Sequence, residues 1–113
     1  MDEYHLKTLK ILEDNPALSQ RNLARELKLS LGKANFILNA LIEKGYIKAK
    51  RFKNSTTKRA YAYYLTPEGI KKKVELTYQY FRIKSLEFES LKQEIQALEQ
   101  DIQILSRPAG PQP

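Results

Sequence analysis

A seven-residue repeat runs along the last part of the chain. Its two series stand three positions apart: Val74, Phe81, Phe88, Ile95 and Ile102, then Thr77, Lys84, Leu91, Leu98 and Leu105. These are the a and d positions of a heptad repeat, and side chains at such positions lie along one face of a helix that pairs with another helix. We therefore expect a long coiled-coil helix. Its expected dimer interface is Phe81, Phe88, Leu91, Ile95, Leu98, Ile102 and Leu105.

The start of this helix is marked by Thr66-Pro67-Glu68. The three residues supply a capping hydroxyl, a proline at the first helical position and an acid near the positive helix end. The periodic pattern continues to about Ser106, and the aperiodic residues 107–113 are expected to be mobile. A long helix of this kind cannot be buried by the small head that precedes it.

The pairing of two such helices is only partly determined by their sequence. Ile at a with Leu at d favours two strands. In a parallel pair Glu87 would meet the partner's Lys92, which is favourable, but Glu94 would meet the partner's Glu99, which is not. The orientation therefore stays open. Lys84 at a d position weakens the interface and would fix its register.

Three shorter helices are expected before the long one. The first spans residues 2–14, with Tyr4, Leu9 and Leu12 inward, and ends at Asn15-Pro16. Ser19 is expected to cap the second helix and Ser30 the third. The third helix is expected to end at Lys44, with Gly45 as the left-handed residue that follows it. In the third helix the three- and four-residue spacing puts one apolar set on a single face: Ala34, Ile37, Leu38 and Leu41.

A β-hairpin is expected between the third helix and the long helix. Two β-prone runs, Tyr46 to Phe52 and Ala60 to Leu65, flank the polar segment Lys53 to Arg59. The order is helix, helix, short turn, helix and basic hairpin, which is that of a winged helix-turn-helix. We therefore predict a mainly α protein with a small β-wing: a winged helix-turn-helix DNA-binding head at 1–69, a dimerisation helix at 70–106 and a tail at 107–113.

Charge is distributed unevenly along the chain. The formal net charge is +7, and residues 19–73 hold fourteen basic and three acidic residues, whereas 85–113 hold two basic and five acidic ones. A surface as basic as the first part suggests an anionic partner such as nucleic acid. The acidic part is expected to have a different task.

The outer face of the third helix carries residues that can read double-stranded DNA in the major groove. Lys33 suits guanine or a phosphate, Asn35 and Asn39 suit adenine, and Phe36 suits a thymine methyl group. Gly32 would let the backbone approach DNA closely. The wing would add cations for the backbone or the minor groove. The expected DNA-binding residues are Ser30, Leu31, Gly32, Lys33, Asn35, Phe36 and Asn39 on the helix, and Lys50, Arg51, Lys53, Lys58 and Arg59 on the wing.

Several classes of function are not supported by the sequence. The chain has no cysteine and one histidine, His5, so it offers no thiolate metal site and no clustered ligands. No catalytic set and no phosphate-binding glycine loop stands out, so we expect neither an enzyme nor a cofactor. No apolar run could span a membrane and no signal peptide is evident, so a soluble, cytoplasmic protein without a membrane partner is expected.

The segments SQRNLARELKLSLGKANFILNALIEKGYIK and KRAYAYYLTPEG resemble the MarR family of bacterial transcriptional regulators, most closely its small branch associated with exopolysaccharide biosynthesis. In the wing, Arg59 stands where the family has an arginine, and Thr57 stands where it has an aspartate. The resemblance implies a homodimeric, sequence-specific regulator, with exopolysaccharide genes as its targets and any small-molecule effector unknown. Two alternatives stay open: a protein-interaction module that docks through the acidic helix, and a non-specific architectural DNA binder.

Overall fold

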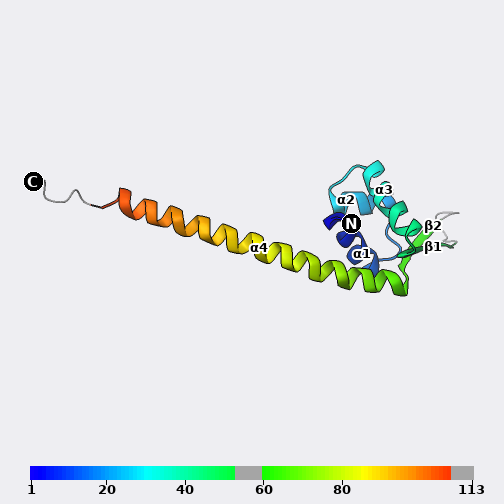
Figure 1. Cartoon of the computed structure of the whole chain (residues 1–113). Helices are drawn as coiled ribbons and strands as arrows, with labels where there is room; N and C mark the ends of the chain where they lie inside the picture. Colours follow the sequence, from blue (N-terminus) through cyan, green and yellow to red (C-terminus); the bar gives the residue numbers. More distant parts are fainter. Residues whose placement is uncertain (53–59, 108–113) are drawn as a thin grey trace, which may run out of the picture. The chain divides into compact units, whose positions relative to one another are not determined.

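The computed structural model describes residues 1–52 and 60–107. Its helices and strands follow in the order α1 Glu3–Asp14, α2 Gln20–Leu27, α3 Leu31–Glu43, β1 Ile47–Phe52, β2 Ala60–Leu65 and α4 Pro67–Leu105 (Figure 1). The predicted class, mainly α with a small β-wing, is confirmed. The chain divides into two units, Met1–Tyr78 and the part from Gln79 onward. The domain limits expected at 69 and 106 stay a prediction.

The three short helices each begin at a side chain that caps them. Asp2 accepts hydrogen bonds from the backbone N–H groups of Tyr4 and His5, while Ser19 caps α2 and Ser30 caps α3. At α2 the Asn22 N–H donates to the Ser19 hydroxyl oxygen over 3.1 Å, and at α3 the Lys33 N–H donates to the Ser30 hydroxyl oxygen over 3.2 Å. Such caps satisfy N–H groups that have no partner within the helix, so the predicted starts at Ser19 and Ser30 are confirmed.

The core of the head lies where these helices meet. α1 contacts both α2 and α3, and α2 packs against α3. Leucines from all three helices and from the start of α4 are fully enclosed, and burying one leucine side chain stabilises the fold by about 1.5–3 kcal/mol. The enclosed leucines are Leu9 and Leu12 of α1, Leu23 of α2, Leu38 and Leu41 of α3, and Leu76 of α4.

One expected core residue of α1 is placed differently. Tyr4 was predicted to face inward, but it is 39% exposed, and Leu6 and Thr8 are buried instead. The buried face of α1 is formed by positions 6, 9 and 12, which share one side of the helix, whereas Tyr4 belongs to the first turn beside it. Thr8 is accommodated because its hydroxyl donates to the Tyr4 carbonyl over 2.7 Å.

The turns around α3 use left-handed backbone geometry. Lys28 ends α2 with φ 57°, and the N–H of Leu29 donates to the Ala24 carbonyl over 3.0 Å. Gly45 follows α3 with φ 79°, and the N–H of Tyr46 donates to the Leu41 carbonyl over 2.9 Å. The second turn was predicted from its glycine. The first turn has Lys28, which carries a side chain, in a left-handed geometry that glycine adopts more readily.

The hairpin is antiparallel and docks on the helices. Ile47 pairs with Leu65 and Phe52 with Ala60, so β2 has its predicted bounds and β1 begins one residue later than expected. Ile47 and Tyr63 are buried. The Tyr63 N–H donates to the Pro16 carbonyl over 2.8 Å, which fixes the second strand to the connection between α1 and α2.

The junction between the wing and α4 is tightly packed. The Thr66 hydroxyl donates to the Gly45 carbonyl over 2.5 Å and accepts from the Gly69 N–H over 3.0 Å. A Cβ on Gly69 would lie 1.9 Å from the Tyr46 carbonyl oxygen, so only glycine fits there. The predicted helix start at Thr66-Pro67-Glu68 is confirmed, and its cap also joins α4 to the end of α3.

No helix within residues 1–52 and 60–107 is long and apolar enough to cross a membrane.

Candidate nucleic-acid interface

The third helix has one face in the head and one face exposed. Its buried residues are Ala34, Ile37, Leu38 and Leu41, as the apolar spacing predicted. The opposite side exposes Leu31, Gly32, Lys33, Phe36 and Asn39. Phe36 is 75% exposed, an unusual position for a phenylalanine in a chain folded alone. This surface, which we call the α3 outer face, brings five of the predicted residues together. Their contact with DNA stays a prediction.

Two residues predicted for the same surface, Ser30 and Asn35, are less available for contact with DNA than the other five. Asn35 is only half-exposed, and its Oδ1 is buried without a hydrogen-bond partner among the residues described. It lies at the edge between the two faces of the helix, so its side chain is less available to a base than that of Asn39. Ser30 is exposed, but its oxygen already accepts the Lys33 N–H as the helix cap.

A hollow of about 430 Å³ adjoins the α3 outer face at the start of α1. Sequence reasoning did not find this contact between the two helices, because only the tertiary packing brings α1 against α3. Its walls combine apolar and charged side chains. They are Asp2, Tyr4 and His5 at the start of α1, Leu29 of the turn between α2 and α3, and Gly32, Lys33, Phe36 and Ile37 of α3.

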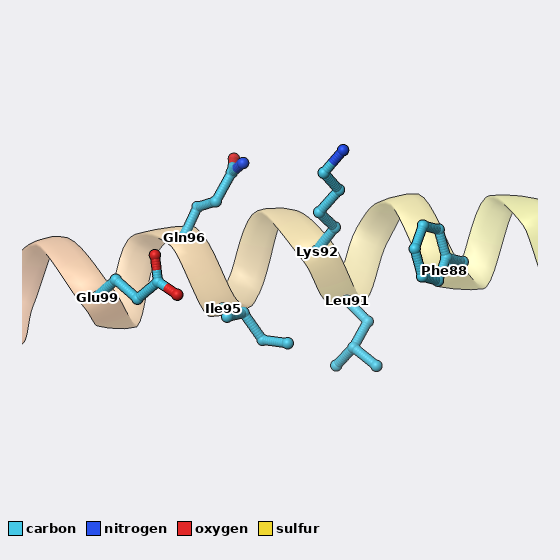
Figure 2. Close-up of a pocket in the computed structure, with 6 residues that line it drawn as sticks. All are labelled: Phe88, Leu91, Lys92, Ile95, Gln96 and Glu99. Carbon is cyan, nitrogen blue, oxygen red and sulfur yellow. The ribbon is translucent and has the colours of Figure 1, made fainter.

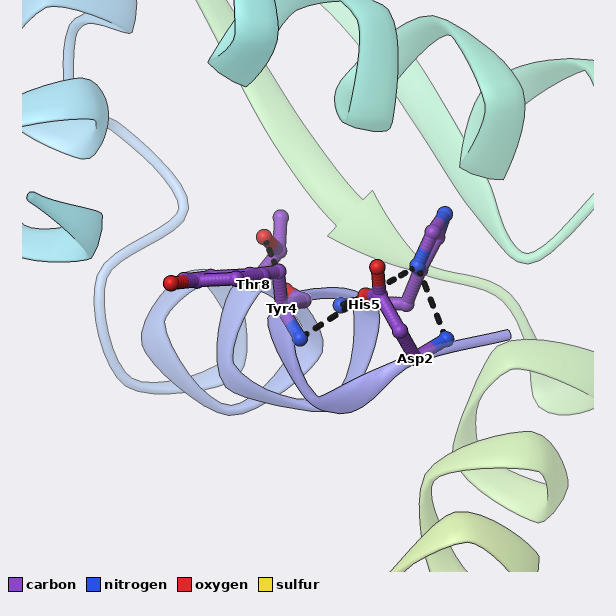
Figure 3. A network of polar contacts seen from close by, with 4 residues as sticks. All are labelled: Asp2, Tyr4, His5 and Thr8. Atoms are coloured by element: carbon purple, nitrogen blue, oxygen red, sulfur yellow. Dashed lines mark hydrogen bonds and ion pairs between the residues drawn. The ribbon is translucent and has the colours of Figure 1, made fainter. Parts of the chain in front are cut away.

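Asp2 and His5 form a polar network on the α1 side of this hollow (Figure 3). The His5 Nδ1 lies 2.8 Å from the Asp2 Oδ1 and 3.2 Å from the Asp2 backbone nitrogen. Burial raises the pKa of the Asp2 carboxyl, but the hydrogen bond and charge of His5 and the backbone N–H bonds outweigh it, so the pKa lies below its usual 3.8. The pairing of an acid with a hydrogen-bonding residue three positions later is a signal that the sequence contains.

The wing holds its described cations against tyrosine rings. The Lys50 Nζ lies 5.8 Å from the centre of the Tyr64 ring, and the Arg51 guanidinium lies 5.7 Å from that of Tyr61. An Arg51 Nη2 also donates to the Tyr61 hydroxyl over 3.4 Å. Both tyrosines are 45% exposed, so each restrains a cation while leaving it at the surface. The predicted residues Lys53, Lys58 and Arg59 lie outside the described part of the chain.

The lysine run at the start of α4 is divided between two environments. Lys73 forms an ion pair with Glu13 of α1, and Lys72 pairs with Glu75 over 3.2 Å and lies over the Tyr46 ring. Lys71 is exposed. Two of the three lysines therefore stabilise the head, which weakens the case for a phosphate role of the whole run.

The predicted dimer residues of α4 all lie at the surface of the single chain. Ile95 is 48% exposed and Leu105 84% exposed, and the others fall between these values. Leu91 and Ile95 point to the same side of the helix, whereas Lys92 and Gln96 point to the opposite side (Figure 2). We call the seven residues Phe81, Phe88, Leu91, Ile95, Leu98, Ile102 and Leu105 the heptad face.

Comparisons with known proteins agree with this architecture. Residues 1–48 match the profile of a family described as winged helix-turn-helix DNA-binding. The chain resembles the PcaV transcriptional regulator of Streptomyces coelicolor, solved with its natural ligand, with 20% identity, coverage of 90% of this chain and 71% of that chain, and a TM-score of 0.69. No curated protein sequence matches the chain.

Two further solved structures share the fold. A MarR protein from Peptoclostridium difficile has 19% identity, coverage of 90% and 68%, and a TM-score of 0.64. Streptococcus pneumoniae FabT in complex with DNA has 19% identity, coverage of 94% and 78%, and a TM-score of 0.55. The expectation that the chain is not an enzyme agrees with the match of residues 1–48 to a DNA-binding family. The head is a winged helix-turn-helix domain, and the chain has the fold of MarR-type transcriptional regulators.

Proposed function

We propose that the protein is a homodimeric transcriptional regulator of the MarR type that binds a specific double-stranded DNA sequence. In this proposal α3 lies in the major groove and the wing contacts the backbone or the minor groove. The observation that carries it is the α3 outer face, because Phe36 and Lys33 are exposed on a helix whose opposite face is buried in the core. Packing of the head does not account for that surface.

Gly32 supports the same assignment. A Cβ added there would meet no protein atom within 4 Å, so the packing of the chain does not require glycine. A glycine in the first turn of a recognition helix allows close approach to DNA, and residues at this end of the helix contact base edges. The solved FabT structure contains DNA, which fits a DNA-binding role for this fold.

The wing supports an electrostatic contribution. Lys50 and Arg51 are exposed cations restrained by Tyr64 and Tyr61. A cation that is already held in place loses less conformational freedom when it binds a phosphate. Contacts between cations and DNA phosphates also release counterions from the DNA, which makes binding favourable and dependent on salt. Lys33 would act beside them at the start of α3.

A dimer would supply two recognition helices for one site. Two half-sites lie about 34–36 Å apart when they are read from the same face of DNA. The heptad face offers the means of pairing, because its seven apolar side chains are uncovered in the single chain. The resemblance to the exopolysaccharide-associated branch makes promoters of exopolysaccharide genes the first natural targets to examine.

The test is selection of binding sites from a random duplex pool at about physiological salt, where specificity is measured against non-specific binding. We expect an inverted repeat with half-sites about one helical turn apart. Retention of DNA without an enriched motif would replace the proposal with an architectural binder. No retention would replace it with a protein-interaction module.

Variants at the α3 outer face complete this test. Lys33→Ala with Asn39→Ala should remove enrichment of the motif, and Lys10→Ala, which removes one exposed charge from α1, should not. If the double variant selects the same motif with the same affinity, α3 is not the recognition helix.

A further inference from the structure

We propose that two copies of the chain pair through α4 in parallel and in register from Phe81 to Leu105. The inference rests on the proposed dimer and adds its orientation, which the heptad sequence left open. Because the head precedes α4 in the chain, parallel pairing would attach both heads at the same end of the coiled coil.

Two neighbouring hollows on α4 repeat at seven-residue spacing. One, of about 330 Å³, is lined by Phe81, Lys84, Ser85, Phe88 and Glu89. The next, of about 350 Å³, is lined by Phe88, Leu91, Lys92, Ile95, Gln96 and Glu99 (Figure 2). Each hollow contains two successive a residues together with the d and e residues that lie between them. In coiled coils four residues at such positions form the hole that receives one side chain of the facing helix.

A second copy of the same helix fits these hollows. The spacing between the hollows equals the seven-residue spacing of the residues on the heptad face, so successive side chains of one copy can enter successive hollows of the other. Ile95 and Ile102 occupy a positions, and Leu91, Leu98 and Leu105 occupy d positions. Within parallel coiled coils, β-branched residues at a with leucine at d favour two strands over three or four, so a parallel pair of α4 helices would be a dimer.

The antiparallel alignment that covers the whole heptad face brings like charges together. In antiparallel pairs g positions face g positions, and e positions face e positions. Phe81 would then lie opposite the partner's Leu105, and Glu87 would meet the partner's Asp101. Glu94 would meet the partner's Glu94, and Lys92 the partner's Lys92. No opposite charges would meet, so this alignment is disfavoured.

A second antiparallel alignment, shifted by one heptad, avoids part of this repulsion. Lys92 would meet the partner's Glu99, which is favourable, but Glu94 would meet the partner's Asp101. Phe81 would lie opposite position 112, beyond Leu105, the last residue of α4. No residue of the partner's α4 would lie opposite Phe81, so this alignment leaves an aromatic side chain of the heptad face without a partner in the coiled coil.

The parallel alignment covers the whole face and balances its charges. Glu87 meets the partner's Lys92, while Glu94 meets the partner's Glu99. Phe81 lies opposite the partner's Phe81, and Phe88 lies opposite the partner's Phe88. Lys84 shares a d layer with the partner's Lys84, and its Nζ lies 3.4 Å from Glu87 on its own helix, which moderates the repulsion. A polar layer of this kind fixes register at a cost in stability.

The chain has no cysteine, so single cysteines can report which residues face each other. Leu105→Cys lies on the heptad face, and Gln100→Cys lies at an outer f position as the matched control. In a thiol–disulfide redox buffer we expect Leu105→Cys to form a disulfide-linked dimer and Gln100→Cys to stay largely unlinked. A dimer in sedimentation that links only when Leu105→Cys is mixed with Phe81→Cys, or only when it is mixed with Phe88→Cys, would overturn the parallel orientation, because these pairs face each other in the two antiparallel alignments.

A charge reversal gives an independent test that needs no cross-link. Glu99→Lys would meet the partner's Glu94 in the parallel pair, and we expect dimerisation about three- to tenfold tighter. In the shifted antiparallel pair it would meet the partner's Lys92, so weaker dimerisation would overturn the proposal. Gln100→Lys, which adds one positive charge outside the interface, is the control.

The same measurements separate this inference from the proposed function. A dimer that selects an inverted repeat but shows no Leu105→Cys linkage contradicts the orientation alone. A monomer in sedimentation that selects no motif contradicts both the dimeric regulator and its pairing.

Discussion

Two glycines show that the same residue has different reasons to be present. Gly69 has no room for a side chain, because a Cβ there would lie 1.9 Å from the backbone oxygen of Tyr46. Gly32 has free space around it, because a Cβ at that position would have no protein atom within 4 Å. Packing within the chain therefore explains Gly69 but does not explain Gly32.

This contrast predicts opposite effects of one substitution. Gly69→Ala should lower the free energy of unfolding by about 1–3 kcal/mol or more, because the backbone of Tyr46 must move. Gly32→Ala should raise it slightly, by roughly 0.5 kcal/mol, because alanine is favoured in helices. Chemical denaturation of both variants measures the difference. Equal stability of the two would contradict the close approach seen at Gly69. Weaker DNA binding by the stable Gly32→Ala variant would support its contact with DNA.

The lowered pKa of Asp2 predicts a dependence of stability on pH. A carboxyl whose pKa is lower in the folded chain contributes stability above its ordinary value of 3.8, and that contribution is lost as the pH falls through the folded pKa. Asp2→Asn keeps a capping oxygen but removes the charge. We expect it to be less stable than the original chain at neutral pH, with the difference shrinking below about pH 4. Thermal unfolding at a series of pH values measures this, and a difference independent of pH would exclude the charge of Asp2 as its cause.

At the scale of an element, the α2–α3 turn sets the direction of α3. Lys28 holds φ at 57°, and Ser30 caps the next helix two residues later. For a residue with a Cβ, this left-handed geometry costs about 1–2 kcal/mol. The turn is nevertheless formed, because Leu29 packs against the buried cluster that contains Leu23 and Leu27.

Relief of this strain gives a prediction for the turn. Lys28→Gly should raise the free energy of unfolding by up to about 1 kcal/mol, reduced by the greater freedom of glycine in the unfolded chain. The exposed Lys44, which ends α3 with φ −75°, offers the matched control, because Lys44→Gly removes the same side chain without relieving strain. A Lys28→Gly variant no more stable than Lys44→Gly would contradict the argument.

At the scale of the whole molecule, the proposed contacts with DNA come from two different parts of the basic head. Of the residues that suit DNA, Lys33 lies on the α3 outer face, whereas Arg51 lies on the wing against Tyr61. A helix in the major groove reads bases, and a wing cation that touches only phosphates does not. Substitutions of Lys33 and of Arg51 should therefore change DNA binding in different ways.

Affinity measured at several salt concentrations on specific and random duplexes checks this division. Arg51→Ala should weaken binding to both duplexes alike and reduce the salt slope by about one phosphate contact. Lys33→Ala should lower affinity for the specific duplex more than for the random one if it reads guanine. A base-selective loss from Arg51→Ala would instead place Arg51 in sequence readout.

Local rules were enough to predict most of the elements. Ser19, Ser30, Gly45 and Thr66 each act at one helix end through contacts with nearby backbone, and each was identified from its neighbours in sequence. Local rules failed for Tyr4, because the inward side of α1 depends on which helices pack against it.

The candidate site was predictable only in part, for the same reason. The spacing of the residues in α3 placed Phe36 and Lys33 opposite the buried face. It did not reveal that Asn35 is half-buried, nor that Tyr61 and Tyr64 hold the wing cations across the hairpin. These contacts depend on the register of the strands and the packing of α3, which pattern alone does not specify.

By itself, the sequence determined the order of the elements, their caps and turns, the basic character of the head and the heptad repeat. All of these follow from interactions between residues a few positions apart, or from the charges they carry. The tertiary structure alone decided which face of α1 is buried, why Gly69 must lack a side chain and where the hollow beside α3 lies. Those features arise from atoms distant in sequence, such as Tyr46 against Gly69, which meet only when the chain has folded.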